Sequence, residues 1–229
     1  MSNSEDLFKE IFAIFLAIIL LTFIVIFNSN SKSGINYLSI LFSFFIAALV
    51  IIINILGKKI VANFYGARIN HKIWMIKRYG FRREAAFNKP LPVGILIPFL
   101  VSLISYGYIM FMTFLEFDVY STSARSAKSQ GIHRFTEITE IHLGLIAAAG
   151  IFFNLIGAVI GYIANFPEFS RLNIYYSLFC LIPLSNLDGS KIFFSTGSSG
   201  NKITFGLPTL WIILLIINLI FLAYSFILI

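Results

Sequence analysis

The sequence has little charge: only 12% of its 229 residues are Asp, Glu, Lys or Arg, whereas 59% are hydrophobic. Soluble domains carry about twice that charged fraction. A chain with so much Ile, Leu and Phe needs lipid rather than water as its solvent. The low charge therefore excludes a soluble globular domain and predicts a polytopic integral membrane protein.

Cysteine is almost absent, since Cys180 is the only one. An intrachain disulfide is therefore excluded, and both oxidising and reducing compartments remain compatible with the chain. Motifs that read DNA or RNA are absent too, so we expect no nucleic-acid partner. The net charge of +7 is instead interpreted as a signal for membrane orientation and contact with anionic lipid.

Long apolar stretches are what the sequence has in abundance. A membrane-spanning helix needs about 20 mostly apolar residues. Six stretches are candidates: 7–27, 35–56, 93–117, 141–165, 172–187 and 207–228. The first is too long for a signal peptide and is interpreted as a retained span. The fourth is rich in Gly and Ala, which allow helices to approach closely.

The basic residues favour one topology for these stretches. If 93–117 enters the membrane and returns on the same side, 15 of the 17 Lys and Arg residues lie on the side of the N-terminus; only Lys32 and Arg171 lie opposite. The positive-inside rule makes that side cytoplasmic. The prediction is an all-α polytopic protein of the cell membrane, with about five transmembrane helices and one re-entrant apolar element. The N-terminus and the basic segment 58–140 are then cytoplasmic.

The most informative stretch is 181–189, where an apolar helix ends in Leu-Asp-Gly. An aspartate at membrane depth is costly and usually faces a partner or a cavity, which makes Asp188 a candidate site residue. The alternative is an ordinary turn, because Asp followed by Gly is common at helix ends.

Three segments, in the same order along the chain, resemble motifs of the site-2 protease family of intramembrane zinc metalloproteases. The Pro-x-x-x-Leu-Asp-Gly sequence that ends at Gly189 resembles the second family signature, whose aspartate is the third zinc ligand. Segment 148–154 resembles the family's Ala-Gly-Pro-x-x-Asn helix, with Ile151 in place of Pro. Segment 54–67 resembles the first signature, which begins with His-Glu-x-x-His and continues into Val-Ala and Tyr-Gly.

The resemblance covers about residues 36–195 and implies a division of the chain. Residues 1–34 form an N-terminal transmembrane helix and loop, and residues 196–229 form a C-terminal transmembrane helix. Residues 35–195 form a site-2-protease-like membrane core, in which 58–140 holds the basic segment and the re-entrant element.

The match fails at the residues that bind zinc. Where the family has His, Glu and His, this chain has Asn54, Ile55 and Lys58. A protein zinc site needs about three ligands, and only Asp188 remains. Without zinc no water is activated, so we expect no catalytic residue, no bound metal and no other cofactor. The chain is interpreted as a pseudoprotease, in which Lys58 and Asp188 lie close together as an ion pair in place of the metal.

A relocated metal site at His142 and Asp188 is the alternative, because both fall at the same membrane face in this topology. The other interpretation of His142 is an interfacial histidine at the start of a helix, which we favour. The basic run 72–83, with Trp74 among its aromatic residues, is interpreted as cytoplasmic charge anchored at the membrane interface. Its alternative is an amphipathic segment lying on anionic lipid.

Three functions follow from these alternatives. The first is a non-catalytic membrane protein that binds a transmembrane helix of a partner or client. The second is an active intramembrane protease, which would hold zinc through other ligands. The third is an unrelated transporter or lipid-handling protein, since intramembrane acids and re-entrant elements also occur in transporters.

Overall fold

The computed structural model describes residues 2–30, 37–78, 86–121, 138–195 and 208–228. The basic residues within 79–85 and most of the polar stretch 120–140 lie outside the described residues. Contacts divide the chain into two units. Unit 1 comprises Met1–Ala48 and His71–Glu116, and unit 2 comprises Leu49–Asn70 and Phe117–Ile229.

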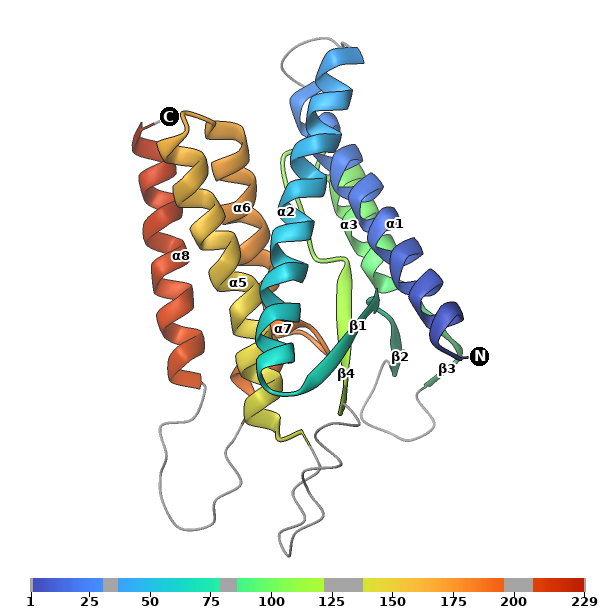
Figure 1. Ribbon diagram of the computed structural model, residues 1–229. Helices are drawn as coiled ribbons and strands as arrows, with labels where there is room; N and C mark the ends of the chain where they lie inside the picture. Colours follow the sequence, from blue (N-terminus) through green and yellow to red (C-terminus); the bar gives the residue numbers. More distant parts are fainter. Residues whose placement is uncertain (1, 31–36, 79–85, 122–137, 196–207, 229) are drawn as a thin grey trace, which may run out of the picture. The chain divides into compact units, whose positions relative to one another are not determined.

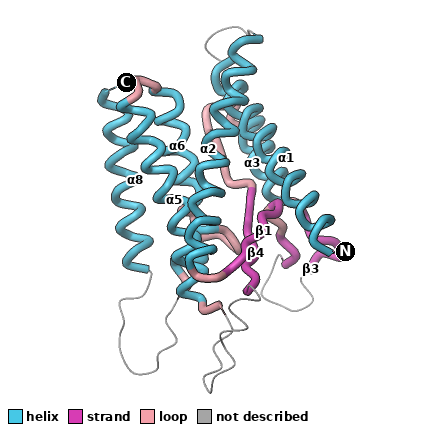
Figure 2. Tube along the Cα trace, viewed as in Figure 1, coloured by secondary structure: helices cyan, strands magenta, loops and turns pink. Residues whose placement is uncertain are grey.

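The described chain is mostly helical, with four short strands (Figure 2). Four of its helices contain a stretch long and apolar enough to cross a membrane. These helices are α1 (Ser2–Asn30), α2 (Tyr37–Phe64), α5 (Glu140–Ile163) and α8 (Pro208–Leu228). The prediction of a helical polytopic membrane protein is confirmed at this level.

In unit 1, α1 lies beside α3 (Val93–Ile104), as Figure 1 shows. The rings of Phe23 and Phe99 pack against each other between them, tilted by 31° and with centroids 5.7 Å apart. The 12 residues of α3 make a helix about 18 Å long, whereas the hydrocarbon core is about 30 Å thick. This helix alone is therefore too short to span a bilayer.

After α3 the chain turns and comes back. Gly107 has a φ of +82°, and a Cβ at this position would lie 2.9 Å from the carbonyl oxygen of Phe27 in α1, so the turn needs glycine. By Phe114 the chain is again beside the start of α3. The Trp74 N–H donates to the Phe114 carbonyl and the Gly94 N–H to the Trp74 carbonyl, both at 2.9 Å. Residues 93–114 thus form a closed apolar hairpin.

The strands were not predicted from the sequence. β2 (Ile76–Arg78) pairs antiparallel with β3 (Ala86–Leu91), and β1 (Ala67–Ile73) pairs with β4 (Leu115–Ser121). The expectation that Trp74 anchors the membrane interface is wrong, because Trp74 is only 1% exposed. In β1, the strand that precedes Trp74, every second residue from Ala67 to His71 is buried.

In unit 2, α5 packs against α6 (Pro167–Cys180), α6 packs against α8, and the short α7 (Asp188–Phe193) packs against α5 (Figure 1). The small residues of α5 face its neighbours, as predicted. A Cβ on Gly157 would lie 3.1 Å from the Asn173 side chain, and one on Gly161 would lie 2.8 Å from the Phe169 ring.

The boundaries expected for the fifth apolar stretch, 172–187, are wrong. The helix begins earlier, at Pro167, because the fixed φ of proline suits the first turn of a helix. It ends at Cys180, before Pro183, since the residue preceding a proline is disfavoured in helical geometry. The remaining residues form the turn that leads into α7.

Candidate functional site

Two polar side chains of α2, Asn54 and Lys58, lie one turn apart on the same face of the helix. They are 1% and 2% exposed, respectively. Gly150 of α5 faces them, and a Cβ there would lie 2.6 Å from Cε of Lys58 and 3.0 Å from Nδ2 of Asn54. Because Gly150 has no side chain, there is space beside α5 in which these two polar groups are enclosed.

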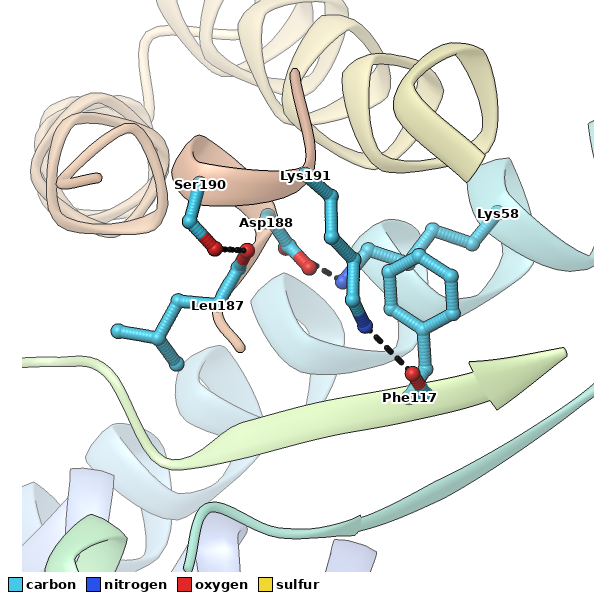
Figure 3. Close-up of polar contacts among 6 residues, drawn as sticks. All are labelled: Lys58, Phe117, Leu187, Asp188, Ser190 and Lys191. Carbon is cyan, nitrogen blue, oxygen red and sulfur yellow. Dashed lines mark hydrogen bonds and ion pairs between the residues drawn. The ribbon is translucent and has the colours of Figure 1, made fainter. Parts of the chain in front are cut away.

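Asp188 is the first residue of α7 and is 3% exposed. Its neighbour Gly189 packs directly on the end of α6, where a Cβ would collide with the carbonyl group of Leu181. The Ser190 hydroxyl donates to the carbonyl oxygen of Leu187 at 2.7 Å, which closes the first turn of α7 (Figure 3). The Leu-Asp-Gly sequence thus fixes the carboxylate at a buried, tightly packed helix start.

Lys58 and Asp188 form a buried ion pair (Figure 3). The distance from Nζ to Oδ2 is 2.6 Å, and each side chain is 3% exposed. The prediction that these two residues lie together is confirmed. Removing one member of such a pair generally costs about 3–5 kcal/mol, because the other charge is left buried without compensation.

Phe117 and Lys191 complete the charged cluster, and sequence reasoning missed both. The Lys191 ammonium donates to the Phe117 carbonyl oxygen and lies 3.6 Å from the centroid of the Phe117 ring (Figure 3). The Lys58 ammonium lies 5.1 Å from the same centroid. Lys191 follows Asp188 by three residues, a spacing that places both on one side of a helix, but no pattern in the sequence indicated Phe117.

The last turns of α6 add two more polar groups beside the carboxylate. Cys180 and Tyr176 stand one turn apart on α6, and both lie near enough to Asp188 to interact with it electrostatically. Both side chains are buried, at 4% and 3% exposed. Asp188 therefore contacts groups from α2 and α6, which explains why its position is so strongly determined.

Two buried amides at the site have unused hydrogen-bonding capacity. Nδ2 of Asn54, and both Nδ2 and Oδ1 of Asn154, have no hydrogen-bond partner among the described residues. Asn154 is fully buried and follows Gly150 by four residues, on the face of α5 that meets α2. Buried polar atoms without a hydrogen-bond partner are rare in proteins, which makes these two amides a distinctive feature of the site.

The residues at the family's zinc positions do not fit zinc. Ile55 has no ligand atom, Asn54 is a poor ligand, and the Lys58 ammonium lies against the one remaining ligand, Asp188, at 2.6 Å. A cation brought to Asp188 would meet a positive charge already in contact with the carboxylate. No group of three or more His, Cys, Asp and Glu side chains that could hold a metal converges within the described ranges.

His142 stands at the start of α5, as expected of an interfacial histidine. Its Nδ1 is 2.6 Å from the hydroxyl of Thr139, and its ring centroid is 4.7 Å from that of Tyr65. The structure thus places His142 with Thr139 and Tyr65, and it places Asp188 with Lys58. The relocated metal site at His142 and Asp188 gains no third ligand from the described residues.

Unit 1 buries charged groups that sequence reasoning did not select. Glu10 of α1 is 3.1 Å from Nδ1 of His71 and also accepts a hydrogen bond from the backbone N–H of that residue. Lys72 reaches Glu116 at 3.4 Å. Glu10 and His71 are 6% and 2% exposed. The signal for this pair was Glu10 itself, an acid inside the first apolar helix.

Comparison of the chain with models of known protein families, with curated proteins and with solved structures gave no match.

Proposed function

We propose that this protein is a non-catalytic membrane protein with a site-2-protease-like core, which binds a transmembrane helix of a partner or client protein. The observation that carries the proposal is the ion pair of Lys58 with Asp188, at 2.6 Å. It joins the two segments that resemble the family's zinc-binding signatures, and it puts a lysine where the family chemistry needs a ligand.

The proposed topology has five crossings and one re-entrant element. The hairpin 93–114, with its short α3, supports the re-entrant element. The crossings are the four long apolar helices and α6, which at 14 residues is about 21 Å long and crosses together with the turn that follows it. The charge distribution supports a cytoplasmic N-terminus.

Partner binding is proposed because a protein that has lost its catalytic residues can keep the surface that binds a transmembrane helix. Asn54 and Asn154 support this step, since their unpaired amide atoms lie in the same buried region as the ion pair. Inside a membrane, side-chain hydrogen bonds between helices contribute about 1 kcal/mol each. A partner helix that separates α2 from α5 and presents polar groups between them would satisfy these amides.

The test is zinc per chain in detergent-purified protein, measured by elemental analysis, with cleavage of a membrane-spanning peptide measured in parallel. We expect no zinc and no cleavage that a chelator stops. About one zinc per chain, lost in Asp188→Ala, would instead establish the active zinc protease.

A rebuilt site tests the family geometry directly. We expect the triple variant Asn54→His, Ile55→Glu, Lys58→His to bind about one zinc per chain, because it supplies two histidines one turn apart beside Asp188. Adding Asp188→Ala to the triple variant is the matched control and should abolish binding. A folded triple variant without zinc would refute the site-2-protease-like arrangement.

A further inference from the structure

A small cavity lies among α5, α6 and α8 in unit 2, near the point where α5 ends and α6 begins. Its volume is about 110 Å³. Apolar cavities of about this size, near 150 Å³, stay dry and bind a molecule such as benzene. The cavity is therefore suited to a short length of hydrocarbon, and it is far too small for a helix about 10 Å across.

The residues that line the cavity are of two kinds. Four of them stand near the helix ends, carry hydroxyl groups and form the hydroxyl level: Tyr162, Ser170, Tyr224 and Ser225. The other four form the apolar level: Ala158, Val159, Ile174 and Phe221. The surface of the cavity itself is almost entirely apolar, as contact with hydrocarbon requires, and the tyrosines of the hydroxyl level are exposed.

The hydrogen-bonding capacity of the hydroxyl level is only partly used by bonds within the protein. Ser170 already donates to the carbonyl oxygen of Ala158 at 2.8 Å. The Tyr162 and Tyr224 hydroxyls are 3.5 Å apart, longer than the usual 2.7–2.8 Å or so for such a bond, so their capacity is barely used. Ser225 is 8% exposed, and its hydroxyl makes no hydrogen bond to a described residue.

We propose that this cavity binds one acyl chain of a membrane glycerophospholipid. The first methylene groups of the chain lie against the apolar level, and the ester and glycerol oxygens lie at the hydroxyl level, where Tyr162, Tyr224 and Ser225 donate to them. Tyrosines at the ends of membrane helices favour this depth, because their rings and hydroxyls match the interface between hydrocarbon and headgroups. The proposal is independent of the proposed function, since it shares no residue with the Lys58–Asp188 site.

The experiment is native mass spectrometry of the full chain, released from detergent micelles that contain palmitoyl-oleoyl phosphatidylglycerol. The wild type should retain one phospholipid per chain. Ala158→Leu fills the apolar level and should lower the retained fraction about tenfold, which corresponds to the loss of about 1.4 kcal/mol of van der Waals contacts with the chain. Ala223→Leu is the matched control: it makes the same change on α8 at an exposed position outside the cavity, and should retain lipid like the wild type.

Circular dichroism and gel filtration check that each variant is folded. If Ala158→Leu does not fold, Val159→Phe takes its place, because Val159 lines the cavity but is 42% exposed. Equal retention by the folded cavity variant and by Ala223→Leu would overturn the proposal. So would a wild-type chain that retains no lipid, or one that retains only detergent or free fatty acid.

Discussion

Among the described residues, each unit has one ion pair in which both side chains are buried, and the two pairs differ in kind. Lys58 and Asp188, in unit 2, join two types of side chain that ordinarily both carry charge at neutral pH, at a distance of 2.6 Å. Glu10 and His71, in unit 1, are 3.1 Å apart, and the histidine is charged only when protonated. By the ordinary properties of these side-chain types, we call the first the fixed pair, because both types carry charge at neutral pH, and the second the conditional pair, because a histidine is charged only when protonated.

The difference shows what each pair can replace. At neutral pH a lysine side chain ordinarily brings a positive charge to a carboxylate, and a bound metal ion brings positive charge as well. A histidine brings that charge conditionally, and its neutral ring can still hydrogen-bond to the acid. In the resemblance to the zinc proteases, the fixed pair is therefore the one that fits the role of a substitute for the metal.

The largest expected effect comes from breaking the fixed pair. Asp188→Leu and Lys58→Met should each lower the free energy of unfolding by about 3–5 kcal/mol, because each leaves one charge buried alone. The double variant should recover most of this loss. Unfolding by SDS titration in mixed micelles measures all three, and losses that simply add in the double variant would contradict the pairing.

Breaking the conditional pair should lower the free energy of unfolding by a smaller amount. Glu10→Gln keeps the size of the side chain and should cost about 1.5–3 kcal/mol, the range for hydrogen bonds that involve a charged group. The same SDS titration measures it, with Glu5→Gln, at an exposed position on the same helix, as the control. A loss as large as that of Asp188→Leu would remove the distinction between the pairs.

The room around the fixed pair can be tested at Gly150. In Gly150→Ala, overpacking against Lys58 and Asn54 should lower the free energy of unfolding by about 1–3 kcal/mol. The higher helix propensity of alanine offsets roughly 1 kcal/mol of this loss. Gly157→Ala has its nearest neighbour at 3.1 Å and should be close to neutral. Thermal unfolding in detergent compares the two, and equal shifts would mean that position 150 does not enclose the pair.

The smallest effect is expected at the edge of the cluster. Lys191→Met retains the aliphatic stem but removes the ammonium that lies over the Phe117 ring, and should cost about 0.5–2 kcal/mol. Thermal unfolding in detergent measures this loss as well. A value as large as that for Lys58→Met would indicate that Lys191 contributes as much as Lys58 to the charge balance of the cluster.

The sequence was sufficient for the parts that follow from polarity and local pattern. Apolar length predicted the four long helices, and the cost of an acid at membrane depth singled out Asp188. It was insufficient where contacts are between distant segments. Phe117 has no local signal because its role depends on its backbone carbonyl and on the face of its ring. Trp74 was misplaced because interface tyrosines and tryptophans look the same in sequence as buried ones.

The distance in sequence between Lys58 and Asp188 has a consequence for the synthesis of the protein. Their positions differ by 130 residues (188 − 58), so at about 10 residues per second the ribosome needs about 13 seconds to supply the aspartate after the lysine. During that interval Lys58 lacks the carboxylate that it contacts in the finished fold. A nascent chain stalled before α7 would therefore leave the Lys58 ammonium without this partner.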